Sequence, residues 1–179
     1  MILRTMPLLA ALLAITSAAL SAQKTAAIHP GRGGSPHVRT EWTIDGANIS
    51  IEYGRPYLKG RPHDVVMPPG VEWRTGADEA TTLRIDRSLT FGTLVVPAGT
   101  YTINTVPGAV WQLVIIKGVG PWGIPYVAGQ DLGRVPMTLG KTAAPVEQLT
   151  ISIDDTPAGG TLRIEWGTIS ARANFVVGK

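Results

Sequence analysis

The chain has 179 residues, of which 44% are hydrophobic and 16% are charged, and its formal net charge is +3. This balance excludes wholesale disorder, which requires few apolar residues and a high net charge. Lysine and arginine are scattered among the acidic residues instead of forming runs, so we expect no nucleic-acid partner.

Residues 1–22 have the pattern of a removable signal peptide. Arg4 precedes an apolar run at 8–15, and small residues dominate 17–22, as in export signals. The run is shorter than the about 20 residues that a membrane span needs. We therefore expect no membrane anchor after cleavage and a periplasmic or secreted protein. The chain has no cysteine, which excludes disulfides and a lipid-modified cysteine.

Residues 23–38 are rich in glycine and proline and have no hydrophobic period. This composition predicts a flexible spacer. The rest of the chain, 39–179, is of a length suited to one domain.

Period-two alternation begins near Thr40. Trp42 and Ile44 alternate with polar residues, and Asp45-Gly46 follows, a strong signal for a two-residue hairpin loop. Such a loop places the apolar residues of both strands on one face.

The same alternation recurs about eight to ten times, separated by Gly/Pro turns. It predicts an all-β fold, a single antiparallel β-sandwich of jelly-roll type. Trp42, Trp111 and Trp166 fall on apolar positions of their strands, which predicts core packing. Two long stretches, 55–72 and 118–133, have no such period, and we expect a binding surface there.

A cationic cluster follows the strand that ends near Tyr53. It contains Arg55, Tyr57, Lys59 and Arg61, and guanidinium groups match carboxylate and phosphate oxygens. This predicts an anion site; the alternative is a solvated loop whose charges protect a sheet edge.

A second polar cluster spans 73–82. Arg74 is expected to pair with Glu79 and hold the loop; alternatively, Glu79 acts as a general base near the first cluster. Trp73 and Trp122 lie outside the predicted strands, so both are candidates for ligand contact.

The sequence predicts no metal site and no cofactor. His29, His37 and His63 each adjoin a proline and lack the spacing that aims two imidazoles at one metal. The alternative is that His37 and His63 meet in space, with Asp64 as an oxygen ligand. The G-x-G-x-x-G match at 118–123 is interrupted by proline and opens no helix, so it does not indicate a dinucleotide site.

Several segments resemble the DUF2911 family of exported bacterial proteins. They are residues 35–37, 43–56, 59–61, 73–82, 97–102 and 145–150, with the Arg-Thr-Gly-Ala-x-Glu-Ala-Thr-Thr run at 74–82 the most specific. The resemblance implies export and a β-rich fold, and no known chemistry. The chain departs from the family pattern at 63–71, where members carry Phe-Gly and Val-Pro-Tyr-Gly segments, and at Asp78, where Asn is usual. If that loop shapes a pocket, its ligand differs here.

The leading hypothesis is a non-catalytic module that binds a small polar or anionic ligand or a partner protein. Its expected site residues are Arg55, Lys59, Arg61, Arg74 and Glu79, with ligand contacts from Tyr57, Trp73 and Trp122. One alternative is a hydrolase or isomerase that uses Glu79 with His37 or His63. Another is a structural envelope protein, which predicts no well-formed pocket near Arg55 and Arg74.

Overall fold

The computed structural model describes residues 23–120, 122 and 129–179, and within them the chain is almost entirely β-structure. This confirms the predicted fold class. The strands are β1 (Lys24–His29), β2 (His37–Ile44), β3 (Ala47–Gly54), β4 (Thr82–Ile85), β5 (Leu89–Phe91), β6 (Leu94–Val96), β7 (Gly99–Val106), β8 (Trp111–Lys117), β9 (Asp131–Thr156) and β10 (Gly159–Val177). One short helix, α1 (His63–Val66), lies in the connection between β3 and β4.

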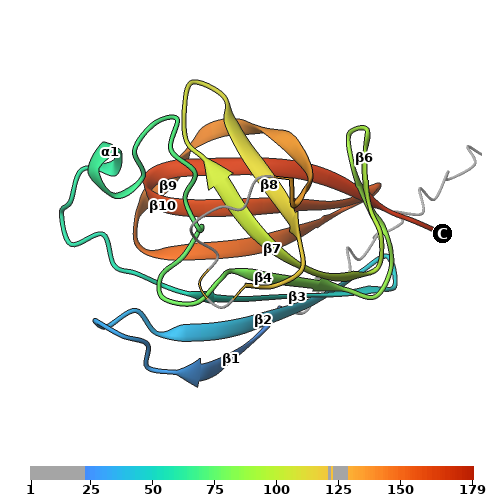
Figure 1. Cartoon of the computed structure of the whole chain (residues 1–179), viewed down its shortest axis with the longest axis horizontal. Helices are drawn as coiled ribbons and strands as arrows, with labels where there is room; N and C mark the ends of the chain where they lie inside the picture. Colours follow the sequence, from blue (N-terminus) through green and yellow to red (C-terminus); the bar gives the residue numbers. More distant parts are fainter. Residues whose placement is uncertain (1–22, 121, 123–128) are drawn as a thin grey trace, which may run out of the picture.

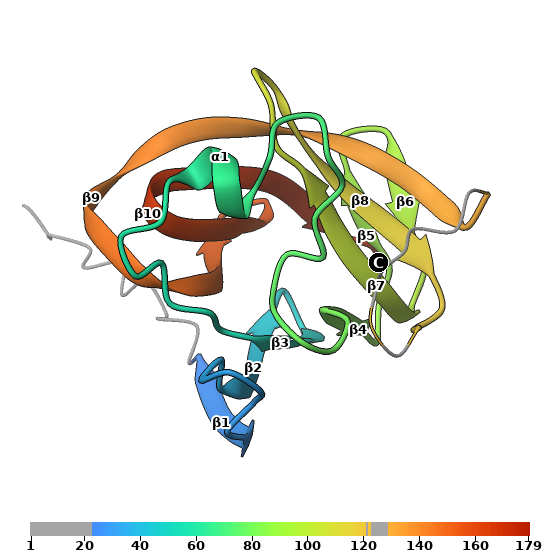
Figure 2. The same ribbon diagram turned by 60° about the vertical axis from the view of Figure 1, so that its left-hand side comes forward.

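The ten strands form one antiparallel sheet in the order β1-β2-β3-β4-β7-β8-β9-β10-β5-β6 (Figure 1). β9 pairs with β8 through residues 131–137 and with β10 through residues 138–156. Figure 2 shows β9 and β10 as long, strongly bent strands. The two layers of the predicted sandwich are therefore parts of one continuous sheet that turns back on itself.

The β2–β3 hairpin illustrates how local sequence sets the register. Asp45 and Gly46 both have positive φ, 47° and 77°, as a type I′ turn requires. Ile44 pairs with Ala47 across the turn and Trp42 with Ile49. All four side chains are buried on one face, so turn chemistry and the hydrophobic pattern specify the same pairing.

The core fills the space between the two layers. Trp42, Trp111 and Trp166 are at most 4% exposed, which confirms that these tryptophans pack inside. On β8, which lies between β7 and β9 in the sheet, every residue from Leu113 to Ile116 is buried, so both faces of this strand are covered.

The predicted spacer is wrong for residues 24–29, which form β1 and pair antiparallel with β2. All six side chains of β1 are exposed. The strand is held by backbone hydrogen bonds, so its pairing leaves no hydrophobic period in the sequence. The predicted spacer is also wrong at its end, because β2 begins at His37. The predicted signal peptide, 1–22, lies outside the described residues. None of the helices in the described part is long and apolar enough to cross a membrane.

The connection from β3 to β4 is attached to the bend of β9 and β10. Leu58 N–H donates to the Glu147 carbonyl at 2.8 Å, and Leu149 N–H donates to the Pro56 carbonyl at 2.9 Å. His63 Nε2 lies 3.1 Å from the Trp166 carbonyl oxygen. Figure 2 shows α1 inside the curve that β9 and β10 make. These contacts hold the first polar cluster against β9 and β10, and residues of the second cluster, Trp73, Gly76 and Ala77, line one hollow with it.

Candidate functional site

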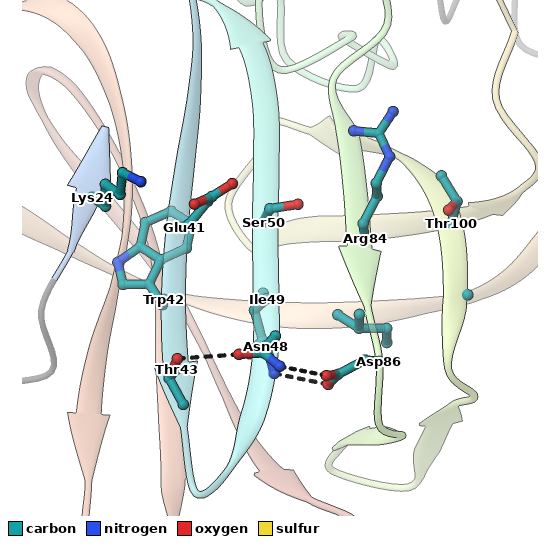
Figure 3. Close-up of a pocket in the computed structure, with 12 residues that line it drawn as sticks. Lys24, Glu41, Trp42, Thr43, Asn48, Ile49, Ser50, Arg84, Asp86 and Thr100 are labelled. Atoms are coloured by element: carbon teal, nitrogen blue, oxygen red, sulfur yellow. Dashed lines mark hydrogen bonds between the residues drawn. The ribbon is translucent and has the colours of Figure 1, made fainter. Parts of the chain in front are cut away.

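One hollow, of about 650 Å³, lies on the outer face of β1, β2, β3, β4 and β7 (Figure 3); we call it the open-face hollow. A row of side chains crosses the five strands in register, namely Lys24, Glu41, Ser50, Arg84 and Thr100. On β2, β3, β4 and β7 these are the outward positions, and the inward positions of the same strands belong to the core; the side chains of β1 are all exposed.

The charges of the open-face hollow are mixed. Asp86 accepts hydrogen bonds from the Asn48 side chain at 2.6 Å and from its backbone N–H at 2.8 Å (Figure 3). These hydrogen bonds hold the pKa of the Asp86 carboxyl below its ordinary value. With acids and bases on one face, this hollow favours no single class of ligand.

A second hollow, of about 600 Å³, is built by loops; we call it the loop pocket. Its walls come from the β1–β2 loop, the start of the β3–β4 connection with α1, and the turn before β4. The lining residues are Arg32, Gly33, Gly34, Ser35, Pro56, Tyr57, Lys59, Arg61, Val65, Val66, Trp73, Gly76, Ala77 and Trp166.

The β1–β2 loop is held against the turn before β4. Arg32 N–H donates to Asp78 Oδ2 at 2.7 Å. Gly31 has φ +72°, and a Cβ there would overlap the Ser35 carbonyl, so only glycine fits this tight turn. The Arg32 guanidinium carbon lies 5.4 Å from the centre of the Trp122 ring, a cation–π contact.

The first cationic cluster is held against β9. The Glu147 carboxylate accepts from Lys59 N–H at 2.7 Å, where Lys59 has a φ of 53°. The Arg61 guanidinium donates to the Leu58 carbonyl at 2.9 Å and to the Tyr57 carbonyl at 2.6 Å. Because a guanidinium has five N–H donors, Arg61 keeps donors for a ligand.

The chemistry of the loop pocket is cationic and aromatic. Arg32, Lys59 and Arg61 line it, and no acidic side chain is among the described residues that do. Its deeper wall includes Trp73, whose ring stacks on Trp166 with centroids 5.7 Å apart and an interplanar angle of 8°. Such a site suits an anion that carries an apolar or ring-shaped part.

The structure brings together four of the eight residues expected from the sequence. Tyr57, Lys59, Arg61 and Trp73 line the loop pocket. Trp122 is not among the described lining residues, but its ring contacts the guanidinium of Arg32, which is. The other three, Arg55, Arg74 and Glu79, are not among its lining residues.

Arg55 and Arg74 bind protein groups. The Arg55 guanidinium donates to the Leu149 carbonyl and to Thr150 Oγ1, each at 2.9 Å, and so ties β3 to β9. Arg74 donates to the backbone carbonyl of Asp78. The expected Arg74–Glu79 ion pair is therefore wrong: the arginine binds the backbone of the same turn, and the Glu79 carboxylate faces two histidines.

Glu79 lies on the other side of the turn from the loop pocket. Its Oε2 is 2.9 Å from His37 Nε2 and 3.8 Å from His29 Nε2. His63, the other partner considered from the sequence, is instead placed against Trp166. The alternative in which His37 meets His63 is therefore wrong; His37 stacks on His29, its partner across β1 and β2.

Sequence reasoning did not single out Arg32, and it considered His29 only as a metal ligand and set it aside. Both lie in the segment that was expected to be a spacer, and no motif marked them. The only signal was their presence beside turn glycines and a proline, which is common in solvated loops.

Comparison with known proteins gives one match. No curated protein and no solved structure matches the chain. The family described as "Protein of unknown function (DUF2911)" matches residues 35–175, from the β1–β2 loop to near the end of β10. The chain therefore belongs to the DUF2911 family.

Proposed function

We propose that the protein is an exported binding module that holds a small anionic ligand in the loop pocket. One observation carries the proposal: three cations from two separate segments, Arg32, Lys59 and Arg61, line one pocket without an acidic neighbour among its described lining residues. The two carboxylates held by these segments, Asp78 and Glu147, accept from the backbone N–H groups of Arg32 and Lys59. Like charges repel each other, so gathering three cationic side chains at one pocket is less unfavourable when an anion also binds there.

The aromatic wall defines the ligand further. Tyr57 is 38% exposed and Trp73 is half-buried, so both offer ring surface to an occupant. Carboxylates or phosphates with an attached ring or short hydrocarbon would use the cations and the rings together.

The two alternatives fit less well. A structural envelope protein would need no pocket near Arg55 and Arg74. The loop pocket is nevertheless lined by Pro56 and Gly76, which are close to these arginines in sequence. A hydrolase or isomerase would use the Glu79–His37 pair, but neither residue is among those that line the loop pocket.

The test uses model anions, benzoate and phenyl phosphate, with uncharged benzyl alcohol as the comparison. Isothermal titration calorimetry on the purified protein should show binding of at least one anion and none of the alcohol. Lys59→Gln should weaken anion binding about tenfold or more, since one charge-assisted contact is lost. The matched control is Lys141→Gln, an exposed lysine on β9 outside the pocket.

Two results would overturn the proposal. One is the absence of binding for both anions to the wild-type protein at millimolar concentration. The other is equal affinity in Lys59→Gln, Lys141→Gln and wild type, which would place any bound anion elsewhere.

A further inference from the structure

Two histidines and one glutamate from three segments converge beside the loop pocket. His29 ends β1, His37 begins β2 as its cross-strand partner, and Glu79 lies in the turn before β4. Each offers one ligand atom, and these atoms all lie within 4.8 Å of one another. We call these three residues the His–His–Glu cluster.

The distances within the cluster suit a small cation. Glu79 Oε2 lies 2.9 Å from His37 Nε2 and 3.8 Å from His29 Nε2. Donor atoms bound to one tetrahedral zinc at about 2.0–2.1 Å are about 3.3 Å apart, between these two values. The imidazole rings are stacked, with centroids 4.3 Å apart and an interplanar angle of 18°. Their Nε2 atoms both lie near the same Glu79 oxygen.

Burial gives a second, independent observation. His37 is 2% exposed. Although His37 Nε2 and Glu79 Oε2 are close, their approach lacks hydrogen-bond geometry, and neither atom has a hydrogen-bond partner among the described residues. Polar atoms that are buried without a partner are costly. A cation bound by both atoms would remove that cost.

The surroundings of the cluster hold it in place. At Gly54 an added Cβ would lie 2.6 Å from His37 Nε2 and would overlap the Ala77 carbonyl, so the missing side chain leaves room for the imidazole and the turn. Asp78 Oδ2 lies 3.6 Å from His37 Nε2 and accepts from Arg32 N–H. This carboxylate can serve as a fourth ligand or as an outer partner that orients the site.

We propose that the His–His–Glu cluster is a binding site for a divalent first-row transition metal, with zinc as the fitting ion. A donor set of two imidazoles and one carboxylate binds such metals in preference to Ca²⁺ and Mg²⁺, because those two ions take oxygen ligands. The negative charge of Glu79, with Asp78 beside it, offsets the charge of the ion. The proposal goes beyond the anion-binding function, because none of the three ligands lines the loop pocket.

Metal binding requires one local change at His29. Gly31 N–H donates to His29 Nδ1 at 3.1 Å, so the neutral ring carries its proton on Nε2. Ligation through Nε2 moves that proton to Nδ1 and breaks this exposed hydrogen bond within the β1–β2 loop.

The experiment is a calorimetric zinc titration of the whole purified protein, stripped with EDTA, dialysed and free of any affinity tag. We expect one zinc per chain, a rise in melting temperature that EDTA reverses, and no such effect of Mg²⁺ or Ca²⁺. Replacement by Co²⁺ should give the visible absorption bands of a site with nitrogen and oxygen ligands.

The variants are His29→Gln and Glu79→Gln, and the matched control is His63→Gln, the third histidine of the chain. His29 has a side-chain exposure of 41%, so its replacement should leave the fold intact. Each cluster variant should bind zinc at least about tenfold more weakly, while His63→Gln should bind like wild type.

The proposal is overturned if wild type does not bind zinc, or if His29→Gln and Glu79→Gln bind it like His63→Gln. Lys59→Gln, the loop-pocket variant, should bind zinc with wild-type affinity. Failure of the anion experiment therefore leaves the zinc result standing, and the reverse also holds.

Discussion

At the scale of single residues, Tyr53 joins the two layers of the folded sheet. Its hydroxyl accepts a hydrogen bond from the Ile151 N–H at 2.9 Å and lies 3.5 Å from the Ile151 carbonyl. The residue is 2% exposed, and its burial raises the pKa of the phenol above the ordinary tyrosine value. A neutral hydroxyl thus satisfies a backbone group of β9 that no neighbouring strand reaches.

Tyr53→Phe should lower the free energy of unfolding by about 1–3 kcal/mol, because Ile151 N–H would be left buried and unpaired. Urea unfolding followed by far-UV circular dichroism measures this loss. The control is Tyr57→Phe, since Tyr57 is 38% exposed and its hydroxyl forms no hydrogen bond within the described part of the chain. Equal unfolding midpoints for both variants would show that the Tyr53 hydroxyl contributes nothing.

At the scale of elements, the contact between the end of β3 and the turn before β4 positions residues of both the loop pocket and the His–His–Glu cluster. The last residue of β3 is Gly54, and the turn at 76–79 lies directly against it. That turn carries Ala77 into the loop pocket and Glu79 into the His–His–Glu cluster. One close backbone contact therefore positions parts of both candidate sites.

Gly54→Ala should be destabilising by about 1–3 kcal/mol, the usual cost of forcing an extra methyl group into a packed site. The added Cβ would overlap the Ala77 carbonyl and push the turn outward. Thermal unfolding followed by circular dichroism provides the measurement. Gly120→Ala is the control, because among the described residues no atom beyond its chain neighbours lies within 4 Å of a Cβ there. If both variants melt at one temperature, the contact does not constrain the turn.

At the scale of the whole molecule, the described strands share one core. Residues from β2 through β10 belong to a single cluster of buried side chains. The long strands β9 and β10 contribute to both layers, so neither layer has a core of its own. A fold of this kind should unfold as one cooperative unit.

We therefore expect coincident unfolding curves from circular dichroism and tryptophan fluorescence. The core tryptophans Trp42, Trp111 and Trp166 report from β2, β8 and β10. The measurement is best made on Trp122→Phe, since Trp122 is 40% exposed and would add a signal from the surface. A fluorescence change at lower urea than the loss of β-structure would contradict a single cooperative core.

The sequence by itself indicated most of the strands from β2 onward, their inward faces and the β2–β3 register. These features are local: alternation reports which side of a strand is buried, and Asp45-Gly46 has the turn conformation that its residues favour. Half of the expected ligand contacts also followed from sequence, because Tyr57, Lys59 and Arg61 are close along the chain and Trp73 lies in the next loop.

Only the tertiary structure decided the rest. β1 pairs through its backbone, so its exposed side chains carry no pattern that sequence reading could use. Its pairing brings His29 to His37 and both to Glu79, and it brings Arg32 to Lys59 and Arg61. The Arg55 guanidinium donates to the carbonyl of Leu149, which is distant in sequence, and Arg74 donates to the Asp78 carbonyl within its own turn. Contacts between residues far apart in sequence depend on how the sheet folds back, and side-chain alternation does not encode that geometry.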